Sequence, residues 1–440
     1  MNNKERLALA EWAMKTAQKK GADEAKVSIS NGREIEIQFR DRKLENLKES
    51  TSNSLSLTIY ANKRYSGHST SDLRKDSLEK FIEEGVLATK YLSEDEFRTL
   101  PDPKLYPTKK DLDLDICDEK YNVITSDERK RLAKDIEEVA LAQSNKIISA
   151  ECGYSDGYFE TVQVHSNGFM GERVSTYFSA GASVTVKDDN GGRPEDWYWG
   201  SGRYFDEIPK PEVLGKEAVT RALRKIGQSK IDSGNYDVVV ENRSGGRLLG
   251  MLSSPMRARS LQQKSSFLEG MLGKKIASEK LTLIDDPFIK RGMGSRLFDD
   301  EGVATRKKTV IDKGILKEYY VDTYYGKKLE MEPNCGSPTN ILFELGDKSA
   351  EEIIKSVKKG IFVTGFIGGN SNSTTGDFSF GLVGLLIENG ELVKPVNELN
   401  ISGNGKEFWN TLVQVGNDPY PYSSWKIPAF HFEQANISGK

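Results

Sequence analysis

Histidine and cysteine hold most protein-bound zinc ions, and in this sequence they are few and scattered. The chain of 440 residues has three histidines and three cysteines. They are His68, His165, His431, Cys117, Cys152 and Cys335. No HExxH, CxxC or HxH pairing occurs, whereas zinc sites usually take ligands from short, regular spacings. We therefore expect structural roles for the histidines, and no zinc or other cofactor bound by this chain alone.

The segment 369–376, Gly-Asn-Ser-Asn-Ser-Thr-Thr-Gly, is dense in hydroxyl groups and could form an anion-binding nest. It has neither the lysine nor the spacing of a P-loop. Serine nucleophiles need a strained, exposed turn and a histidine base, and no GxSxG elbow is present. The simpler interpretation of the segment is a polar connection between two strands.

Two acidic clusters could bind a hard cation or supply an acid and a base. They are Asp-Asp-Pro at 285–287 and Asp-Asp-Glu-Gly at 299–302. Adjacent acidic residues beside glycine or proline more often form Asx turns and caps. Taken alone, these clusters are weak evidence for a site.

The elements that must position these residues begin with a small helix-and-strand unit, residues 1–100. Apolar periodicity predicts helices over 4–20 and 76–91. Strand-like runs between them lie at 24–30, 33–39, 54–60 and 64–70. Asn31-Gly32 separates the first two runs and is a strong hairpin signal. Prolines at 101, 103 and 107 then indicate a linker.

A second unit, residues 115–228, repeats this layout in outline. Helices are predicted over 126–143 and 213–226. Strands between them are predicted at 146–154, 159–165, 172–186 and 198–204. The shared order of helix, antiparallel strands and helix favours an internal duplication, although no repeat is visible at the level of residues.

The third domain, residues 234–440, is rich in strands and glycine turns. Turns are predicted at Lys313-Gly314 and Asn389-Gly390, and helices near Ser244 and over 350–359. The fold class is therefore α+β: two small helix and antiparallel-strand units followed by a larger β-rich C-terminal domain. A closed or strongly curved sheet is the natural form of that domain.

Composition excludes several classes of protein. The 63 basic and 66 acidic residues give a net charge of -3, whereas nucleic-acid-binding domains usually show a basic excess. Direct nucleic-acid binding is not expected. The longest apolar runs, such as 382–387, are far shorter than the ~20 residues of a membrane span. The charged N-terminal helix and the odd number of cysteines favour a cytoplasmic protein.

An ordered series of motifs in the third domain resembles the TldD/PmbA family, whose members have been called modulators of DNA gyrase. The motifs are LTLIDDP from Leu281, DDEG from Asp299, KGIL from Lys313, TTGDFSF from Thr374 and IENG from Ile387. The two preceding units look like the first and second domains of that family. The resemblance therefore spans nearly the whole chain.

The resemblance implies a zinc chemistry for the TldD-type subunit of the family, with an HExxxH helix early in this domain and a cysteine near the C-terminus. Two imidazoles and a thiolate would hold Zn²⁺ while the glutamate acts as general base. Here Gly250 and Met251 stand where the first histidine and the glutamate would be, and Pro255 stands at the second histidine. The segment 415–428 has serines but no cysteine. The chain thus resembles the PmbA, or TldE, subunit, which lacks the metal motif.

Such a subunit is implied to be non-catalytic and to pair with a TldD-like zinc metallopeptidase, or else to form a homodimer. The complex would act on unfolded or small peptides, with this chain forming interface and chamber wall. Candidates for contact with the peptide are Asp299, Asp300, Glu301, Thr375 and Asp377. Whether the chain is itself an enzyme stays open.

Two alternative functions remain. One is a regulatory protein that binds DNA gyrase and has no peptidase role. The other is a homodimer with an unrelated hydrolytic or ligand-binding role in the hydroxyl-rich loop at 371–375.

Overall fold

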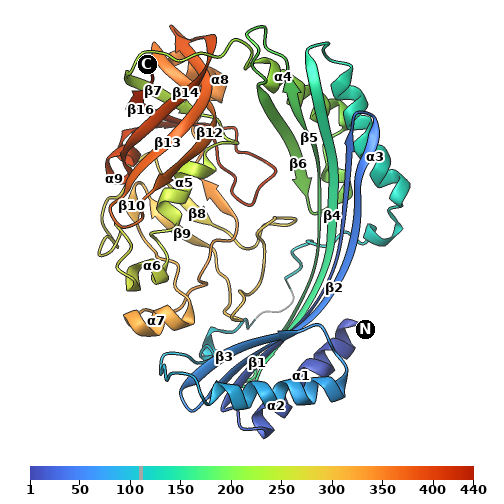
Figure 1. Ribbon diagram of the computed structural model, residues 1–440. Helices are drawn as coiled ribbons and strands as arrows, with labels where there is room; N and C mark the ends of the chain where they lie inside the picture. Colours follow the sequence, from blue (N-terminus) through green and yellow to red (C-terminus); the bar gives the residue numbers. More distant parts are fainter. Residues whose placement is uncertain (109–111) are drawn as a thin grey trace.

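The computed structural model describes residues 1–108 and 112–440, and one long antiparallel sheet runs through its first half (Figure 1). The sheet has six strands in the order β3-β2-β1-β4-β5-β6. Their bounds are β1 (Glu24–Arg40), β2 (Lys43–Ala61), β3 (Arg64–Thr70), β4 (Ile147–His165), β5 (Met170–Val186) and β6 (Glu195–Gly202). Because β1 pairs with β4 over almost its whole length, the first two predicted units share this sheet. Part of the predicted linker between them, residues 109–111, lies outside the described residues.

Asn31 and Gly32 lie inside β1, so the predicted hairpin at this dipeptide is wrong. Asn31 is paired on both sides, with β2 and with β4. The chain reverses instead at Asp41 and Arg42, whose φ angles of 53° and 59° suit a two-residue hairpin turn. The period-two alternation of apolar residues continues on both sides of Asn31-Gly32, and that alternation decides the strand.

Four helices cover one face of the long sheet in two pairs. Their bounds are α1 (Asn3–Lys19), α2 (Lys75–Thr89), α3 (Ser126–Leu141) and α4 (Pro211–Leu223). The first pair packs on the end of β1 that contains Val27 and Ile29, and the second pair packs on the end that contains Ile35 and Ile37. All four side chains are odd-numbered, so they share one face. The opposite face is left to meet the C-terminal domain (Figure 1).

The C-terminal domain is built on two further sheets. The first has the order β10-β9-β8-β11, and the second β14-β13-β12-β7-β16-β15. Strand bounds are β7 (Gly234–Val240), β8 (Leu283–Asp285), β9 (Lys308–Asp312), β10 (Ile315–Leu316), β11 (Ile341–Phe343), β12 (Lys359–Ser371), β13 (Asp377–Glu388), β14 (Glu391–Asn404), β15 (Leu412–Val415) and β16 (Phe430–Ser438). An added pairing of β14 with β16 closes the second sheet into a barrel-like form. The predicted α+β class with a β-rich C-terminal domain is confirmed.

Short helices connect these strands. Their bounds are α5 (Gly246–Ser253), α6 (Ala258–Gln262), α7 (Thr323–Leu329), α8 (Ala350–Ser356) and α9 (Gly405–Phe408), with 3-10 turns at Pro103–Leu105, Tyr121–Val123, Phe205–Glu207 and Trp409–Thr411. The predicted turns at Lys313-Gly314 and Asn389-Gly390 are confirmed, since all four residues have positive φ between paired strands. No helix among the described residues has the length and apolar character needed to cross a membrane.

Candidate functional site

Helix α5 carries the positions at which the family resemblance implies a zinc motif. It follows the buried strand β7 and directs Met251 into the core, where 4% of that residue is exposed. Gly250 lies beside it on a face with open space, since a Cβ there would meet no atom within 4 Å. Pro255 lies beyond the end of the helix at Ser253. The helix therefore keeps the first two positions together and leaves the third in the following turn.

The side chains at these three positions do not fit a zinc ion. Gly250 has no side chain, Met251 has a buried thioether and Pro255 has a hydrocarbon ring. None supplies the imidazole, thiolate or carboxylate that Zn²⁺ takes in proteins. The described residues also contain no group of three or more His, Cys, Asp and Glu side chains placed to hold a metal ion.

Arg247 connects the exposed face of α5 to the hydroxyl-rich loop. Its Nη2 donates to the carbonyl oxygens of Gly369 at 2.6 Å and Gly368 at 3.2 Å. Its guanidinium lies 4.6 Å from the centre of the Phe380 ring. The helix and the loop at 369–376 are therefore neighbours, and a cation lies between them.

The three histidines lie in separate surroundings. His68 contacts the Ser66 hydroxyl at 2.8 Å, and His431 lies 3.4 Å from Asp237. His165 is buried at the end of β4, where its Nδ1 lies 2.9 Å from the Tyr106 hydroxyl. Burial, together with the charge of Lys26, lowers the pKa of His165 to about 3. His165 is therefore a neutral hydrogen-bonding group at physiological pH.

Asp299, Asp300 and Glu301 form a turn that joins the third domain to the long sheet. The carbonyl oxygen of Asp300 accepts hydrogen bonds from Lys26 at 3.1 Å and Gln163 at 3.2 Å, in β1 and β4. The Glu301 carboxylate accepts the backbone N–H of Thr323 at 2.8 Å, at the start of α7. These contacts connect three separate elements, so the turn has a structural role.

Asp299 lies inside this turn. Its Oδ1 accepts the backbone N–H groups of Glu301 at 2.9 Å and Val303 at 3.0 Å. Burial and the neighbouring charge of Glu301 raise the pKa of Asp299 to about 6, against the opposing effect of these hydrogen bonds. Gly302 follows with φ at 80°, and a Cβ there would approach the His165 ring to 3.1 Å. A glycine is therefore needed at this position.

Thr375 and Asp377 lie at the tip of the β12–β13 hairpin and are exposed. The Thr375 hydroxyl donates to Asp377 at 2.7 Å, and the Asn404 amide donates to the other Asp377 oxygen at 2.9 Å. Within the described part of the chain, no contact joins this group to the turn at 299–302. The structure thus places the five candidate residues in two groups, and their contact with a peptide stays a prediction.

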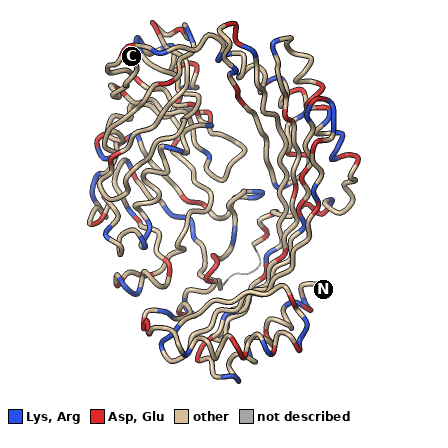
Figure 2. The backbone as a smooth tube through the Cα atoms, viewed as in Figure 1, with Lys and Arg blue, Asp and Glu red and all other residues tan. Residues whose placement is uncertain are grey.

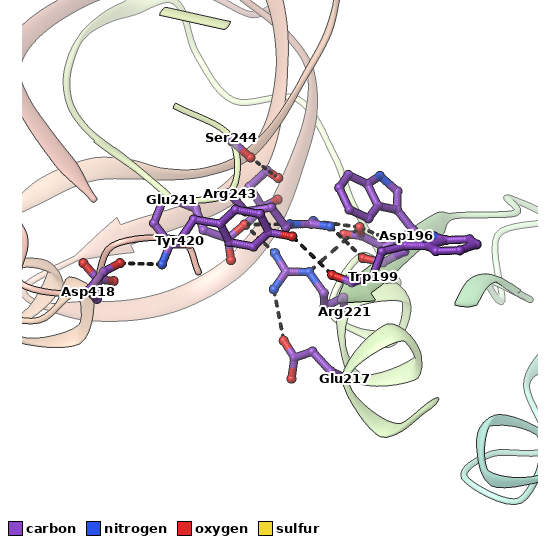
Figure 3. Close-up of polar contacts among 12 residues, drawn as sticks. Asp196, Trp199, Glu217, Arg221, Glu241, Arg243, Ser244, Asp418 and Tyr420 are labelled. Atoms are coloured by element: carbon purple, nitrogen blue, oxygen red, sulfur yellow. Dashed lines mark hydrogen bonds and ion pairs between the residues drawn. The ribbon is translucent and has the colours of Figure 1, made fainter. Parts of the chain in front are cut away.

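A network of buried charges joins the middle and C-terminal domains (Figure 3). Arg243, just after β7, contacts Asp196 in β6 at 2.8 Å, and Lys225 contacts the same carboxylate at 3.1 Å. Arg221 in α4 forms an ion pair with Glu241. The Arg243 and Asp196 side chains are each 5% exposed. Because charges removed from water need partners, the network ties the two domains together.

The carboxyl of Asp196 is the centre of this network. Burial alone would raise its pKa, but the charges of Arg243 and Lys225 outweigh burial and hold the pKa below its usual value. Asp196 is therefore ionised in the folded chain, as an ion-paired centre requires.

The loop between β15 and β16 crosses toward the same junction. The Tyr420 hydroxyl donates to the carbonyl oxygen of Trp199 at 3.3 Å, and the Asn242 amide donates to the Asp418 carbonyl at 2.7 Å. Figure 3 shows Tyr420 and Asp418 beside the charged residues. In this loop the Ser423 hydroxyl accepts the backbone N–H of Trp425 at 3.1 Å. The segment 415–428 therefore forms ordered contacts between domains.

A cavity of about 350 Å³ lies between the long sheet and the loop at 293–296. Its floor includes Thr161 in β4 and Arg173 in β5, and its other walls include Arg203 and Arg296. Arg173 is odd-numbered whereas the helix-facing β5 residues, such as Phe178, are even-numbered. The cavity therefore lies on the face of the sheet opposite the helices. Its described lining has three guanidinium groups and no carboxylate.

Sequence reasoning missed these arginines. Each is the single basic residue in its own short segment, and no spacing groups them. The alternation of β5 places Arg173 on the free face, which is the one local signal available. The three arginines lie close together only because the folded chain brings distant segments side by side.

The two small units on one sheet, followed by a barrel-like third domain, form the architecture of a three-domain metallopeptidase family. Residues 25–89 match the model for PmbA/TldA metallopeptidase domain 1, residues 119–226 the central domain, and residues 233–439 the C-terminal domain. These matches cover well over half of the chain. The chain belongs to the PmbA/TldD metallopeptidase family.

Individual relatives agree with this assignment. The chain is 29% identical to metalloprotease PmbA of Escherichia coli O157:H7 over 423 residues, covering 95% of this chain and 93% of that protein. A solved structure from Bacteroides thetaiotaomicron, named as a candidate modulator of DNA gyrase, is 41% identical with a TM-score of 0.97 and 100% coverage of both chains. TldE from Thermococcus kodakarensis has the same fold, with a TM-score of 0.87 at 21% identity, covering 98% of this chain and 100% of that one.

Proposed function

We propose that this chain is the metal-free, PmbA/TldE-like subunit of a peptidase complex that acts on unfolded or small peptides. Its zinc would be held by a TldD-like partner. The observation that carries the proposal is the set of side chains at the motif positions, Gly250, Met251 and Pro255, which offer zinc no ligand and water no general base. The relatives named metalloprotease support a peptidase-related role.

A subunit without its own catalytic group would contribute interface and chamber wall. The outer part of β2, residues 43–54, offers an edge for this purpose, because β3 pairs with β2 only from Leu55 onward. Leu44 and Leu47 on this edge are each 45% exposed. Unpaired strand edges with apolar side chains bind extended peptides or partner strands by strand addition.

The proposal is tested by purifying the full chain alone and measuring bound zinc and peptidase activity. Neither is expected. Co-expression with a TldD-like chain from the same genome should then yield a complex that contains zinc on the partner and cleaves unfolded peptides. Stoichiometric zinc on this chain alone, with activity abolished by His165→Gln or His431→Gln, would refute the proposal.

A regulator of DNA gyrase is the second candidate, favoured by the name of the Bacteroides relative. Figure 2 shows basic and acidic residues interspersed along both halves of the chain, and the net charge is -3. Contact with gyrase would therefore be with protein and not with DNA. Affinity purification from the cytoplasmic fraction distinguishes the candidates: a TldD-like chain or a second copy supports the peptidase role, and gyrase subunits support regulation.

A further inference from the structure

Among the described residues, the lining of the cavity between the long sheet and the loop at 293–296 has three arginines and no acidic side chain. Arg203 donates to three backbone carbonyl oxygens, those of Thr176 at 2.9 Å, Met293 at 2.5 Å and Gly292 at 3.4 Å. Arg296 donates from Nη2 to the Ser337 hydroxyl at 2.9 Å and to nearby carbonyls. All these acceptors are neutral groups.

Two donor groups at the cavity, the Arg173 guanidinium and the Arg296 Nε atom, have no partner among the described residues. Within the described part of the chain, the side chain of Arg173, which is exposed to solvent, has no hydrogen bond and no ion pair. The Nε atom of Arg296 is buried and has no hydrogen-bond partner. Buried donors are nearly always satisfied in proteins, so this N–H group is available to a bound acceptor.

The two acidic side chains that influence the pKa values of these arginines do not neutralise them by direct contact. Asp300 acts on Arg173 and Glu207 acts on Arg203 through space, but neither is within ion-pairing distance in the described structure. The Glu207 carboxylate is occupied by the backbone N–H groups of Arg203 and Tyr204 at 2.8 and 3.1 Å. Among the residues that the structure describes, no carboxylate lines the cavity or forms an ion pair with its three arginines.

The electrostatics of the arginines agree with this geometry. Burial, followed by the charge of Arg173, lowers the pKa of Arg203 to about 10. Like charges held in a concave, low-dielectric space focus a strong positive potential, and an anion bound there would relieve the repulsion.

A second hollow of about 250 Å³ adjoins the cavity and shares Arg173 and Arg296 with it. Apolar side chains form part of its lining, among them Ile116, Leu297 and Phe298, and the acidic residues Asp113 and Glu172 also border it. Arg173 and Arg296 therefore lie between a cationic space and a partly apolar one. A carboxylate with an apolar group close to it matches both.

We propose that this cavity binds the C-terminal carboxylate of a peptide, with the apolar side chain of its last residue in the adjoining hollow. Arginine suits this role because its planar guanidinium meets both oxygens of a carboxylate. The choice of a peptide as ligand rests on the proposed function, whereas the anion site rests on the arginines alone.

The test uses the full chain alone and the pentapeptide Ala-Ala-Ala-Ala-Leu with an N-terminal fluorophore, followed by fluorescence anisotropy. The C-terminal amide should bind at least about tenfold more weakly than the free acid, because hydrogen bonds to charged groups are the stronger class. An amidated peptide with an internal glutamate should bind as weakly as the plain amide. Inorganic phosphate at equal concentration should not displace the free acid.

Arg173→Gln is the informative variant, since Arg173 supports no described contact. It should weaken binding of the free acid at least about tenfold, while its unfolding temperature without peptide stays level or rises as repulsion is relieved. Arg131→Gln, on the exposed side of α3, is the matched control and should change neither. Equal binding of acid and amide, equal binding of the glutamate peptide, displacement by phosphate, or an unchanged Arg173→Gln variant would overturn the proposal.

The failure of this inference can be separated from failure of the proposed function. If the chain assembles with a TldD-like partner but does not bind the peptide carboxylate, only the inference is refuted. If the chain binds the carboxylate but forms no complex with such a partner, the arginine site is supported and the proposed function is refuted.

Discussion

Arg243 and Asp196 form a buried ion pair between the third domain and the long sheet, with Nη2 and Oδ1 2.8 Å apart. The two residues are 47 positions apart in the sequence, and each comes from a separate domain. The guanidinium also lies 4.3 Å from the centre of the Trp197 ring. This contact is one of those that hold the sheet against the barrel-like domain.

Replacing Asp196 with asparagine should destabilise the chain. The substitution keeps the shape of the side chain but removes the charge that Arg243 and Lys225 share, and it leaves Arg243 with Glu241 alone, at 3.4 Å. Breaking a buried pair costs about 3 kcal/mol or more. Urea unfolding at pH 7, followed by fluorescence, measures the change. Glu351→Gln is the control, because it breaks the exposed pair between Glu351 and Lys355 and should produce no measurable shift. Equal effects of the two variants would contradict this account.

The ion pair between Arg243 and Asp196 also predicts that the folding stability of the chain depends on pH. Because the pKa of Asp196 is lowered in the folded chain, its contribution is fully present above the unfolded carboxyl pKa and is lost as the pH falls through the lower folded value. The wild type should therefore lose stability in acid more steeply than Asp196→Asn. Unfolding midpoints measured from pH 7 down to pH 3 test this, and parallel curves would count against it.

For Asp299 we expect the opposite dependence of folding stability on pH. Its folded pKa is raised to about 6 by burial, so the folded state binds the extra proton between the unfolded pKa and about pH 6. Stability from this group therefore falls as the pH rises through that window. Asp299→Asn keeps an oxygen for the N–H groups of Glu301 and Val303, and it should stabilise the chain at pH 7 by up to about 3 kcal/mol. It should have little effect at pH 4.

Asp300→Asn is the matched control for this prediction, since only the backbone oxygen of Asp300 makes described hydrogen bonds. Chemical denaturation of both variants at pH 4 and pH 7 provides the comparison. If Asp299→Asn destabilises the chain equally at both pH values, the carboxylate makes a favourable contact that outweighs its burial.

Local sequence signals predicted the helices well and the sheet only in part. Asn2 and Glu5 form a capping box at the start of α1, and such caps are readable from sequence. The pairing of Lys26 with His165, which merges the first two units into one sheet, joins positions far apart in the chain. No local signal specifies such a contact, and the Asn31-Gly32 turn signal favoured two separate strands.

The candidate site shows the same division. Gly250, Met251 and Pro255 were located because an ordered motif series fixed their register. The grouping of Arg173, Arg203 and Arg296 could not be predicted in this way. It depends on which face of β5 lies against the third domain. Periodicity gives the face of one strand, but not which distant loop covers it.

His165 should stay neutral far below the usual range for histidine. Burial lowers its pKa to about 3, so below about pH 6.5 the unfolded chain binds a proton that the folded chain does not, and stability falls as the pH falls. Nitrogen-15 NMR of the imidazole should show an unprotonated ring at pH 5 in the folded protein. In His165→Gln the loss of stability between pH 6.5 and 4 should be smaller. Protonation of the ring near pH 6.5 in the folded chain would contradict this.

Gly250 offers a test of how helix α5 is built. A Cβ at this position meets no atom within 4 Å, and glycine in a helix interior is about 0.5–1 kcal/mol less favourable than alanine. Gly250→Ala should therefore stabilise the chain by roughly that amount. Gly215→Ala in α4 is the matched control, because its Cβ would lie 2.9 Å from the carbonyl oxygen of Ile136, so it should destabilise. The unfolding temperatures of the two variants, compared with that of the wild type, test this prediction. A destabilised Gly250→Ala variant would show that the open face of α5 is needed for the fold, and its glycine could not then be treated as a vacated ligand position.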